Sequence, residues 1–455
     1  MTVSKHYTEK SVQIRHFGQY KCDFSSFDKN YVINIVNIMT KYEALKKYFG
    51  YTQFRPAQET VIDALLSGSD VMAIMPTGAG KSLCFQIPAL LFDGVTIVVS
   101  PLISLMKDQV ARLRLGDIPV AFINSSLTQK QYNEVLRRVA IGQYKIIYVA
   151  PERLNTADFL RFALETPISF AAIDEAHCVS QWGQDFRPSY LKIADFIGKL
   201  KTRPVIGAFT ATATNDVKKD IIRFLGIKNP VCLTTGFDRP NLYFGVEKPK
   251  DKRKRFFEIV NSHSLDCGII YCSTRNAVNM VYNDLLRNGM QPTRYHAGLD
   301  DAERRLNQED FISGKKPVVV ATNAFGMGID KPDVRYVLHY NMPKNLENYY
   351  QEAGRAGRDG DPSECILLFA DEDIKTSEFF INKSGEVDRE LDILSPKERR
   401  KVQLHDIKRL DSITRYCETT SCLRKYILRY FGDKQKQPCG NCSNCLKPGF
   451  WKSLL

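Results

Sequence analysis

Residues 71–82 read VMAIMPTGAGKS, and the helical pattern LCFQ follows at 83–86. The first five residues are uniformly apolar, which is typical of a short parallel strand that is covered on both faces. The two glycines then allow a tight turn, because glycine tolerates backbone conformations that other residues avoid. This succession of buried strand, tight turn and helix predicts an α/β fold built on a parallel sheet.

Short apolar runs of the same kind recur in two sets, with helical stretches between them. The first set continues with Val95–Val99, Lys145–Val149, Phe170–Ile173 and Val205–Phe209, and the second comprises Gly268–Tyr271, Val318–Val320, Tyr336–His339 and Cys365–Phe369. Two α/β domains in tandem are the simplest account of this pattern. Turn-forming residues cluster at Gly236–Asn241, where we expect the seam between the domains and a cleft able to hold a ligand.

The chain length of 455 residues favours two or three domains. Met39 begins a stretch that resembles a natural start, so residues 1–38 are predicted to be an N-terminal extension. The two α/β domains are expected at 39–236 and 237–370. After residue 370 the alternation ends, and polar, charged helical sequence predicts a third, mainly helical module at 371–455.

Hydrophobic residues make up 44% of the chain and charged residues 25%, which is ordinary for a globular protein and excludes a largely disordered one. The formal net charge of +13 is compatible with a polyanionic partner but does not by itself require one. No run approaches the ~20 apolar residues of a membrane span, and the N-terminus lacks the apolar core of a signal peptide. We therefore expect a soluble intracellular protein.

The turn at Thr77-Gly78-Ala79-Gly80-Lys81-Ser82 has the composition of a phosphate-binding loop. Its glycines let backbone N–H groups approach phosphate oxygens, Lys81 reaches the β and γ phosphates, and the Ser82 hydroxyl reaches Mg²⁺. Met75 occupies the place of the first glycine in the strict pattern. On this motif alone, a glycine-rich turn with a chance Lys-Ser pair therefore stays open.

A second motif, Asp174-Glu175-Ala176-His177, follows the predicted strand that ends at Ile173. Asp174 is expected to project from the carboxyl end of that strand, the edge where ligands bind in open α/β sheets. There it would hold Mg²⁺, while Glu175 would polarise the attacking water. His177 would couple the site to the neighbouring domain.

With these two motifs the chain resembles superfamily 2 helicases, whose phosphate loop often lacks the leading glycine. The segment at 210–213, TATA, resembles the motif that links hydrolysis to nucleic-acid contact, and QEAGRAGR at 351–358 resembles the last helicase motif. The resemblance implies two RecA-like domains and implies that Arg358, with Arg355 beside it, approaches the γ-phosphate as an arginine finger. Taken without the family, two arginines on a glycine-containing helix would more simply be a solvated face.

Narrower features resemble the RecQ family of DNA helicases over roughly Lys41 to Leu446. The segment YTQFRPAQ at 51–58 is similar to that family's adenine-recognition segment. The resemblance implies that Gln58 reads the adenine edge, Tyr51 stacks on the ring and Arg55 supports the nucleotide. A helix cap around Pro56 is a structural reading of the same residues and is compatible with this role. The residues implied to bind ATP are Tyr51, Arg55, Gln58, Thr77, Gly78, Ala79, Gly80, Lys81, Ser82 and Gln351.

Directly after the acidic motif, SQWGQDFRPSY at 180–190 resembles the aromatic-rich loop of RecQ proteins. Trp182, Phe186 and Arg187 offer stacking and phosphate contacts that suit single-stranded DNA. Local packing is the alternative explanation for aromatic residues in a polar loop. Further segments that resemble family motifs, most of them expected to line the DNA track, are 100–105, 148–153, 271–275 and 321–330.

The chain contains twelve cysteines, which in a reducing compartment are not expected to form disulfides. Five lie singly among apolar neighbours and are predicted to be buried core residues: Cys84, Cys232, Cys267, Cys272 and Cys365. Four others have the spacing C-x16-C-x2-C-x2-C, which favours tetrahedral zinc, with an iron–sulfur cluster as the rival: Cys422, Cys439, Cys442 and Cys445. The segments around them resemble the RecQ zinc-binding module. This resemblance favours zinc over an iron–sulfur cluster and implies that Cys417 is not a ligand. Four thiolates leave no open position, so the site is expected to be structural.

The resemblance implies an α/β protein with two tandem RecA-like parallel-sheet domains and a small helical zinc-binding module. It also implies an ATP-dependent 3′-to-5′ DNA helicase that uses ATP, Mg²⁺ and Zn²⁺ and acts in repair and recombination in the bacterial cytoplasm, associated with the nucleoid. Expected partners are single-stranded DNA, single/double-strand junctions and a single-strand DNA-binding protein, with the chain a monomer. Family members usually continue into a winged helix, whereas this sequence stops at Leu455. The alternative is therefore a DNA-stimulated ATPase that remodels or anneals strands without efficient unwinding, and RNA as substrate stays open.

Overall fold

A computed structural model of the chain describes residues 39–183, 185–326, 331–387, 395–433 and 435–448. The predictions for the first 38 residues, and for the last four residues of the 321–330 motif, lie outside the described part. Contacts between elements group everything described from Thr40 onward into one compact unit. Among the described helices, none is both long and apolar enough to cross a lipid bilayer.

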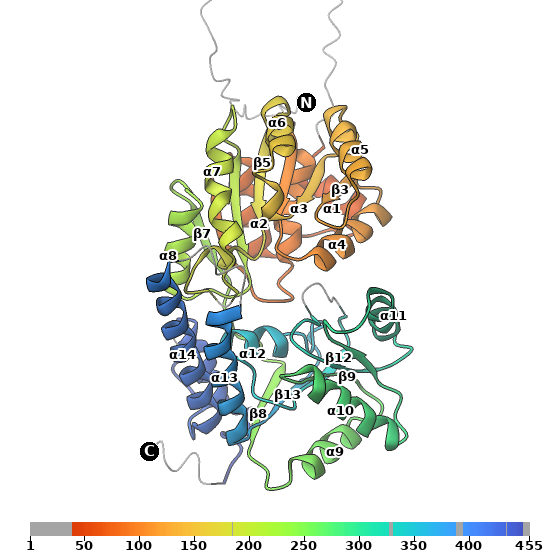
Figure 1. The fold of residues 1–455 in the computed structure, drawn as a ribbon, viewed down its shortest axis with the longest axis vertical. Helices are drawn as coiled ribbons and strands as arrows, with labels where there is room; N and C mark the ends of the chain where they lie inside the picture. The colour runs from red at the N-terminus through yellow and green to blue at the C-terminus, as the bar shows by residue number, and fades with distance from the viewer. Residues whose placement is uncertain (1–38, 184, 327–330, 388–394, 434, 449–455) are drawn as a thin grey trace, which may run out of the picture. The chain divides into compact units, whose positions relative to one another are not determined.

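The first sheet, whose strands β3, β5 and β7 are labelled in Figure 1, has seven parallel strands in the order β3-β4-β2-β5-β6-β1-β7. Its strands are β1 (Val71–Ile74), β2 (Val95–Val99), β3 (Val120–Ile123), β4 (Ile146–Val149), β5 (Ile168–Ile173), β6 (Val205–Thr210) and β7 (Val231–Thr234). Successive side chains of β1 enter two different hydrophobic cores. Met72 and Ile74 pack in one core, and Val71 and Ala73 pack in the other. Because both faces of the sheet are covered, its central strands read as continuous apolar runs.

The connections of the first sheet are mainly helical, and several helices begin at a residue whose side chain caps the first turn. Thr40 and Thr128 each form a reciprocal capping box, with Glu43 and Gln131 as the partners. The α-helices are α1 (Lys41–Phe49), α2 (Pro56–Leu66), α3 (Lys81–Leu91), α4 (Ile103–Leu115), α5 (Gln129–Ala140), α6 (Ala157–Glu165), α7 (Lys192–Lys199) and α8 (Asn215–Phe224). Short 3-10 helices are η1 (Pro151–Arg153), η2 (Ala176–Val179) and η3 (Pro188–Leu191).

The second sheet has six parallel strands in the order β10-β11-β9-β12-β13-β8. Its strands are β8 (Leu242–Glu247), β9 (Cys267–Tyr271), β10 (Thr293–Tyr295), β11 (Val318–Ala321), β12 (Val334–His339) and β13 (Ser363–Leu368). The associated helices are α9 (Lys252–Ser262), α10 (Arg275–Arg287), α11 (Asp301–Ile312) and α12 (Leu346–Ala353). The predicted α/β class with two parallel sheets in tandem is therefore confirmed.

The C-terminal module is helical, as predicted, and comprises α13 (Asp371–Val387), α14 (Pro396–Glu418) and α15 (Leu423–Tyr430). Ser395 starts α14 with a capping box to Glu398. After α15 the chain returns to the second sheet, where Ser443 donates its backbone N–H to Phe244 O at 2.9 Å. This module therefore covers the otherwise open edge of β8, which protects that edge from unwanted pairing.

The apolar runs locate the central strands but not all of the sheet. The four strands that lacked a prediction, β3, β7, β8 and β10, are the four edge strands. One cysteine prediction is wrong: Cys232 lies on the edge strand β7 and is exposed, because that strand has a neighbour on one side only. Cys267, at the start of β9, is only partly buried.

Candidate functional site

Three loops meet at the carboxyl edge of the first sheet because its central strands are parallel. The phosphate-loop residues 75–81 follow β1, Asp174 follows β5, and Thr210 ends β6. β6 pairs with both β1 and β5, so the three loops are neighbours in space. Residues far apart in sequence are thereby brought to one edge, as expected for ligand sites in open α/β sheets.

The phosphate loop depends on two glycines with positive φ, Gly78 at 85° and Gly80 at 78°. Gly80 also has no room for a side chain, because a Cβ there would lie 2.1 Å from Gln58 Nε2. Directly after Gly80, Lys81 begins α3. The loop therefore presents backbone N–H groups and the positive end of a helix to the same point, which suits phosphate.

Lys81 forms the centre of a buried charge cluster. Its Nζ lies 2.8 Å from an Asp174 carboxylate oxygen and 2.9 Å from one of Glu175. Burial alone would lower the pKa of Lys81, but the two carboxylates raise it, so the ammonium stays charged. Burial raises the pKa of Asp174. At Glu175 burial also acts to raise the pKa, but Lys81 together with other nearby groups, Arg355 among them, lowers it overall. The cluster thus keeps one cation beside an ionised Glu175, with the side chains of Lys81 and Glu175 15% and 16% exposed.

Glu175 is held in an unusual backbone conformation, with φ 45° and ψ 47°. The left-handed region is uncommon for residues other than glycine, and such strain gathers at functional sites. Its neighbour Asp174 is fixed through the backbone, since its N–H donates to Val99 O and its O accepts from the Tyr190 hydroxyl at 3.0 Å. The acidic pair is therefore rigidly placed beside Lys81.

A chain of polar contacts leads away from the acidic pair. His177 Nδ1 lies 3.4 Å from Glu175 and 2.9 Å from the hydroxyl of Thr210. Thr210 in turn donates to Thr212 O, and the Gln351 amide donates to the Thr212 hydroxyl at 3.2 Å. Burial lowers the pKa of His177, so the ring is neutral near pH 7. These contacts connect the acidic pair to Gln351 on α12, which packs on the second sheet.

The predicted adenine segment lies next to the phosphate loop. Gln58 is buried; its Nε2 donates to Gly80 O at 3.1 Å, and its Oε1 accepts from the Arg55 backbone N–H at 2.9 Å. Arg55 Nη1 donates to Gly78 O at 2.6 Å, whereas the Tyr51 ring is 58% exposed. Gln58 and Arg55 therefore support the loop directly here. Reading an adenine edge requires Gln58 to exchange those hydrogen bonds.

A cavity of about 770 Å³ joins these groups. Arg355 and Arg358, from the turn that follows α12, line the same cavity as Lys81 and Glu175. Arg355 is only 7% exposed and donates to Gly326 O. Further lining residues are Tyr51, Arg55, Gln58, Thr77, Gly78, Gly80, Ser82, Asp174 and Gln351. The predicted nucleotide residues are thus brought together, except that Ala79 contributes through its carbonyl and packs on a core.

The cavity contains the donor set that a magnesium nucleotide needs. Positive charge from Lys81, Arg355 and Arg358 suits a polyphosphate, and the hydroxyl of Ser82 with the carboxylate of Asp174 offers the oxygen ligands that Mg²⁺ prefers. The volume falls within the range of small-molecule sites. The residues present therefore fit ATP with Mg²⁺.

The aromatic-rich loop lies close to the acidic pair in sequence and against α14 in space. Trp182 is 37% exposed, and its ring meets that of His405 edge-on at 4.9 Å. Arg187 donates to Pro101 O at 2.7 Å and pairs with Asp185, and Phe186 is partly buried. Trp182 therefore has the exposure that DNA contact requires, and it also packs locally against His405. The loop is compatible with both explanations given for its aromatic residues.

The four cysteines of the predicted zinc site converge, and their Sγ atoms lie within 4.8 Å of one another. Tetrahedral zinc with Zn–S bonds of about 2.3 Å requires thiolates roughly 3.8 Å apart, and Cys439 Sγ lies 4.0 Å from Cys445 Sγ. Backbone N–H groups also donate to the sulfurs of Cys422, Cys439 and Cys442. The residues fit a single zinc ion, whereas in a four-iron cluster each thiolate must bind a different iron.

Replacing Cys442 by serine is expected to release zinc and to unfold the C-terminal module, because four-cysteine sites supply folding free energy through the metal. Zinc content by atomic absorption and thermal unfolding measure the two effects. Cys417→Ser is the matched control, since Cys417 is outside the four-sulfur cluster. Equal zinc loss in both variants would contradict the assignment of the ligands.

Sequence reasoning missed several residues at the site. Arg239 donates to Thr77 O and to the carbonyls that precede Arg358, yet it was noted only as part of a turn-rich seam. Tyr48, Phe49 and Arg112 also line the cavity. They carry no local motif, so nothing in the sequence distinguishes them from ordinary helix residues.

The fold and the site define a helicase core of two parallel-sheet units with a nucleotide cavity. Family models agree: residues 55–220 match the DEAD/DEAH box helicase model, 251–360 the helicase conserved C-terminal domain and 371–446 the RecQ zinc-binding model. The ATP-dependent DNA helicase RecQ of Bacillus subtilis is 46% identical over 88% of this chain. RecS of Bacillus subtilis, whose name describes a probable ATP-dependent DNA helicase, is 34% identical over 91% of this chain and 93% of its own length. The chain belongs to the RecQ family of ATP-dependent DNA helicases.

The match to full RecQ proteins covers part of their length. The chain spans 66% of the Bacillus subtilis RecQ and 66% of the Haemophilus influenzae RecQ, to which it is 41% identical. Among solved structures, Saccharomyces cerevisiae Dbp5 bound to RNA and ADP BeF3 has a TM-score of 0.61 at 18% identity, covering 81% of this chain and 98% of that one. Mycobacterium smegmatis Lhr bound to single-stranded DNA and AMP-PNP has a TM-score of 0.58 at 16% identity, covering 82% of this chain and 56% of that one. At such identities the likeness concerns the fold alone.

Proposed function

We propose that this protein is an ATP-dependent DNA helicase of RecQ type that couples ATP hydrolysis to 3′-to-5′ movement on single-stranded DNA and to duplex unwinding. The observation that carries the proposal is the cavity in which Lys81, Asp174 and Glu175 meet Arg355 and Arg358. Its support is membership of a family that includes the ATP-dependent DNA helicases RecQ of Bacillus subtilis and Haemophilus influenzae. The direction of movement and a role in repair and recombination rest on family resemblance.

In the proposed reaction the chain binds ATP with the phosphates on the loop at 77–82. Mg²⁺, held by Ser82 and Asp174, would neutralise charge on the β and γ phosphates. Glu175 orients the attacking water and accepts its proton, which its ionised state permits. Lys81 leaves its carboxylate partners for the γ-phosphate when the nucleotide enters.

The second half of the proposed site supplies the positive charge that stabilises the transition state. Arg358 and Arg355 come from the other parallel-sheet unit, so hydrolysis depends on both units meeting at the nucleotide. The contacts from His177 through Thr210 to Gln351 offer a route by which the acidic pair senses that meeting. Such dependence converts hydrolysis into movement.

We propose that the DNA strand is contacted by Trp182, Phe186 and Arg187. Aromatic faces stack on bases without sequence preference, and arginine contacts phosphates. We further propose domain boundaries at 39–236, 237–370 and 371–455, an adenine contact by Tyr51, Arg55 and Gln58, and action as a monomer. The proposed setting is the bacterial cytoplasm at the nucleoid, on single/double-strand junctions with a single-strand DNA-binding protein.

Strand separation tests the proposed function. Fluorescently labelled duplexes with a 3′ tail, a 5′ tail or a fork are incubated with the protein and either ATP or a non-hydrolysable analogue. ATP-dependent release from the 3′-tailed and forked duplexes, but not from the 5′-tailed duplex, is expected. DNA-stimulated ATP turnover without release would instead identify an ATPase that remodels or anneals strands, and stimulation by RNA alone would overturn the choice of DNA.

A further inference from the structure

The segment Phe237–Leu242, which leads from the first sheet to the second, is held by one arginine of the C-terminal module. Arg424, on α15, is 3% exposed, and its Nη1 donates to Asp238 Oδ1 at 2.7 Å and to Arg239 O. Its Nη2 donates to the carbonyls of Pro240 and Leu242. The guanidinium also lies over the Phe244 ring, 5.5 Å from its centroid. A planar cation with fixed donors therefore binds one carboxylate and three backbone carbonyls of this segment.

Two further residues of the same module contact the beginning of this segment. The Phe237 backbone N–H donates to Asp433 Oδ2 at 2.9 Å, and the Phe237 ring stacks on Phe431 at 4.8 Å. From the other side, the Tyr350 hydroxyl donates to Phe237 O at 2.6 Å. Phe237 is 2% exposed. The segment is thus fixed at its start as well as along its length.

The fixed segment in turn holds the turn that carries the candidate arginine fingers. Arg239 Nη2 donates to Ala356 O at 2.9 Å and to Gly357 O at 2.8 Å. Its Nη1 lies 3.3 Å from Gly354 O and 3.3 Å from Thr77 O of the phosphate loop. Arg239 therefore contacts both halves of the nucleotide site through backbone carbonyls.

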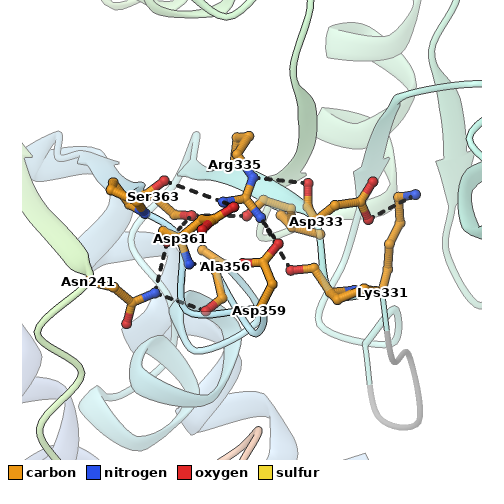
Figure 2. A network of polar contacts seen from close by, with 12 residues as sticks. Asn241, Lys331, Asp333, Arg335, Ala356, Asp359, Asp361 and Ser363 are labelled. Carbon is orange, nitrogen blue, oxygen red and sulfur yellow. Dashed lines mark hydrogen bonds and ion pairs between the residues drawn. The ribbon is translucent and has the colours of Figure 1, made fainter.

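Asn241 adds two further hydrogen bonds to the chain at and after that turn (Figure 2). Its Nδ2 donates to Gly357 O at 2.9 Å and to Asp361 O at 2.9 Å. Arg335, at the start of β12, pairs with Asp359, which directly follows that turn. Gly357 has φ 53°, and a Cβ there would lie 2.4 Å from Asn241 Nδ2. The turn can follow this path only because residue 357 is glycine.

We propose that Arg424 is a positioning residue for ATP hydrolysis, because it fixes the 237–242 segment. From that segment, Arg239 and Asn241 hold the 354–358 turn. That turn places Arg355 and Arg358 against the phosphate loop. The inference rests on the proposed function and assigns the C-terminal module a role in turnover beyond its own folding. Small displacements of charged groups at such a site are costly, because a shift of about 1 Å can lower a rate by ~10²-fold.

The first test compares two arginines of the same helix. Arg424→Gln is expected to lower DNA-stimulated kcat by about tenfold to a hundredfold, while KM for ATP changes by less than about twofold. Arg429→Gln is the matched control, since Arg429 is exposed on α15 and the change of charge is identical. Zinc content is measured for both variants, and both are expected to retain it. Wild-type turnover in Arg424→Gln, or zinc loss that accounts for its lower turnover, would overturn the inference.

A second variant lies outside the C-terminal module and does not depend on its folding. Arg239→Gln is expected to lower kcat at least as far as Arg424→Gln, and the double variant is expected to be no slower than Arg239→Gln alone. Residues that act through one contact chain show such non-additive effects. Full addition of the two losses would overturn the inference, because Arg424 would then act by a separate route.

Hydrogen–deuterium exchange provides a readout that needs no turnover. Amides at 237–242 and 354–360 are expected to exchange faster in Arg424→Gln than in the wild type, and to be unchanged in Arg429→Gln. Unchanged protection at 354–360 in Arg424→Gln would overturn the inference. A wild-type protein without DNA-stimulated turnover would contradict the proposed function instead, and exchange would then decide this inference by itself.

Discussion

Arg358→Gln is expected to lower DNA-stimulated ATP turnover by about 10³- to 10⁵-fold, the range observed when an arginine finger is absent from phosphoryl transfer. Arg358 lines the cavity of Lys81 and Glu175, and its Cγ lies 3.7 Å from the position that a Cβ of Gly78 would occupy. Its side chain therefore lies beside the phosphate loop, where negative charge develops on the transferred group. Glutamine keeps polarity and most of the length but removes the cation.

Steady-state turnover with saturating DNA measures this effect, and binding of a fluorescent nucleotide shows whether the site remains formed. Arg305→Gln is the matched control, because Arg305 is 78% exposed on α11 and pairs only loosely with Glu309 at 4.0 Å. Nucleotide affinity is expected to change far less than kcat, since the cation acts mainly on the transition state. A loss of less than tenfold in Arg358→Gln would remove Arg358 from the role of arginine finger.

Glu175→Gln is expected to lower turnover by about 10²- to 10⁴-fold, the contribution usual for a general base. The substitution keeps the shape of the side chain and removes its capacity to accept a proton. Glu175 is held beside Lys81 at 2.9 Å, and its pKa is lowered because Lys81 and other nearby groups, Arg355 among them, together outweigh burial. It is therefore ionised near pH 7 and ready to act.

The variant is also expected to retain nucleotide and to bind DNA, because Lys81 and the loop at 77–82 are intact. Glu165→Gln, on the exposed end of α6, is the control for loss of a carboxylate elsewhere in the same unit. Pre-steady-state turnover separates hydrolysis from product release in both proteins. A Glu175→Gln variant that hydrolyses ATP at the wild-type rate would show that another group orients the water.

The central strands of both sheets could be predicted from sequence because neighbours cover them on both sides and both faces. β2 and β4, for example, are wholly buried and read as uninterrupted apolar runs. Two edge strands carry no such signal, because β7 is largely exposed and β10 has only three residues, whereas the edge strand β3 is a short apolar run. Edge strands are recognised by pairing with a neighbour, and pairing is a property of the tertiary structure.

The candidate nucleotide residues can be recognised in the sequence because phosphate binding requires a local motif. A phosphate loop must have its glycines, Lys81 and Ser82 in one short segment, and Asp174 must end a strand. Arg239 has no such constraint, because its function in the structure is to donate to backbone carbonyls of the 354–357 turn and of Thr77. The residues around Arg239 in the sequence do not differ from those around an ordinary surface arginine, so only the fold identifies its role.

The α/β class, a phosphate loop, an acidic pair and a four-cysteine cluster can all be predicted from the sequence, since each leaves a pattern of residue types in the chain. The contacts that connect them become visible only in the folded protein. It shows that Gln58 supports the loop through Gly80, that Arg239 spans the phosphate loop and the turn carrying Arg358, and that Arg424 holds the segment between the sheets. The physical reason is that a hydrogen bond to a backbone carbonyl leaves no trace in the identity of the residue that supplies the carbonyl.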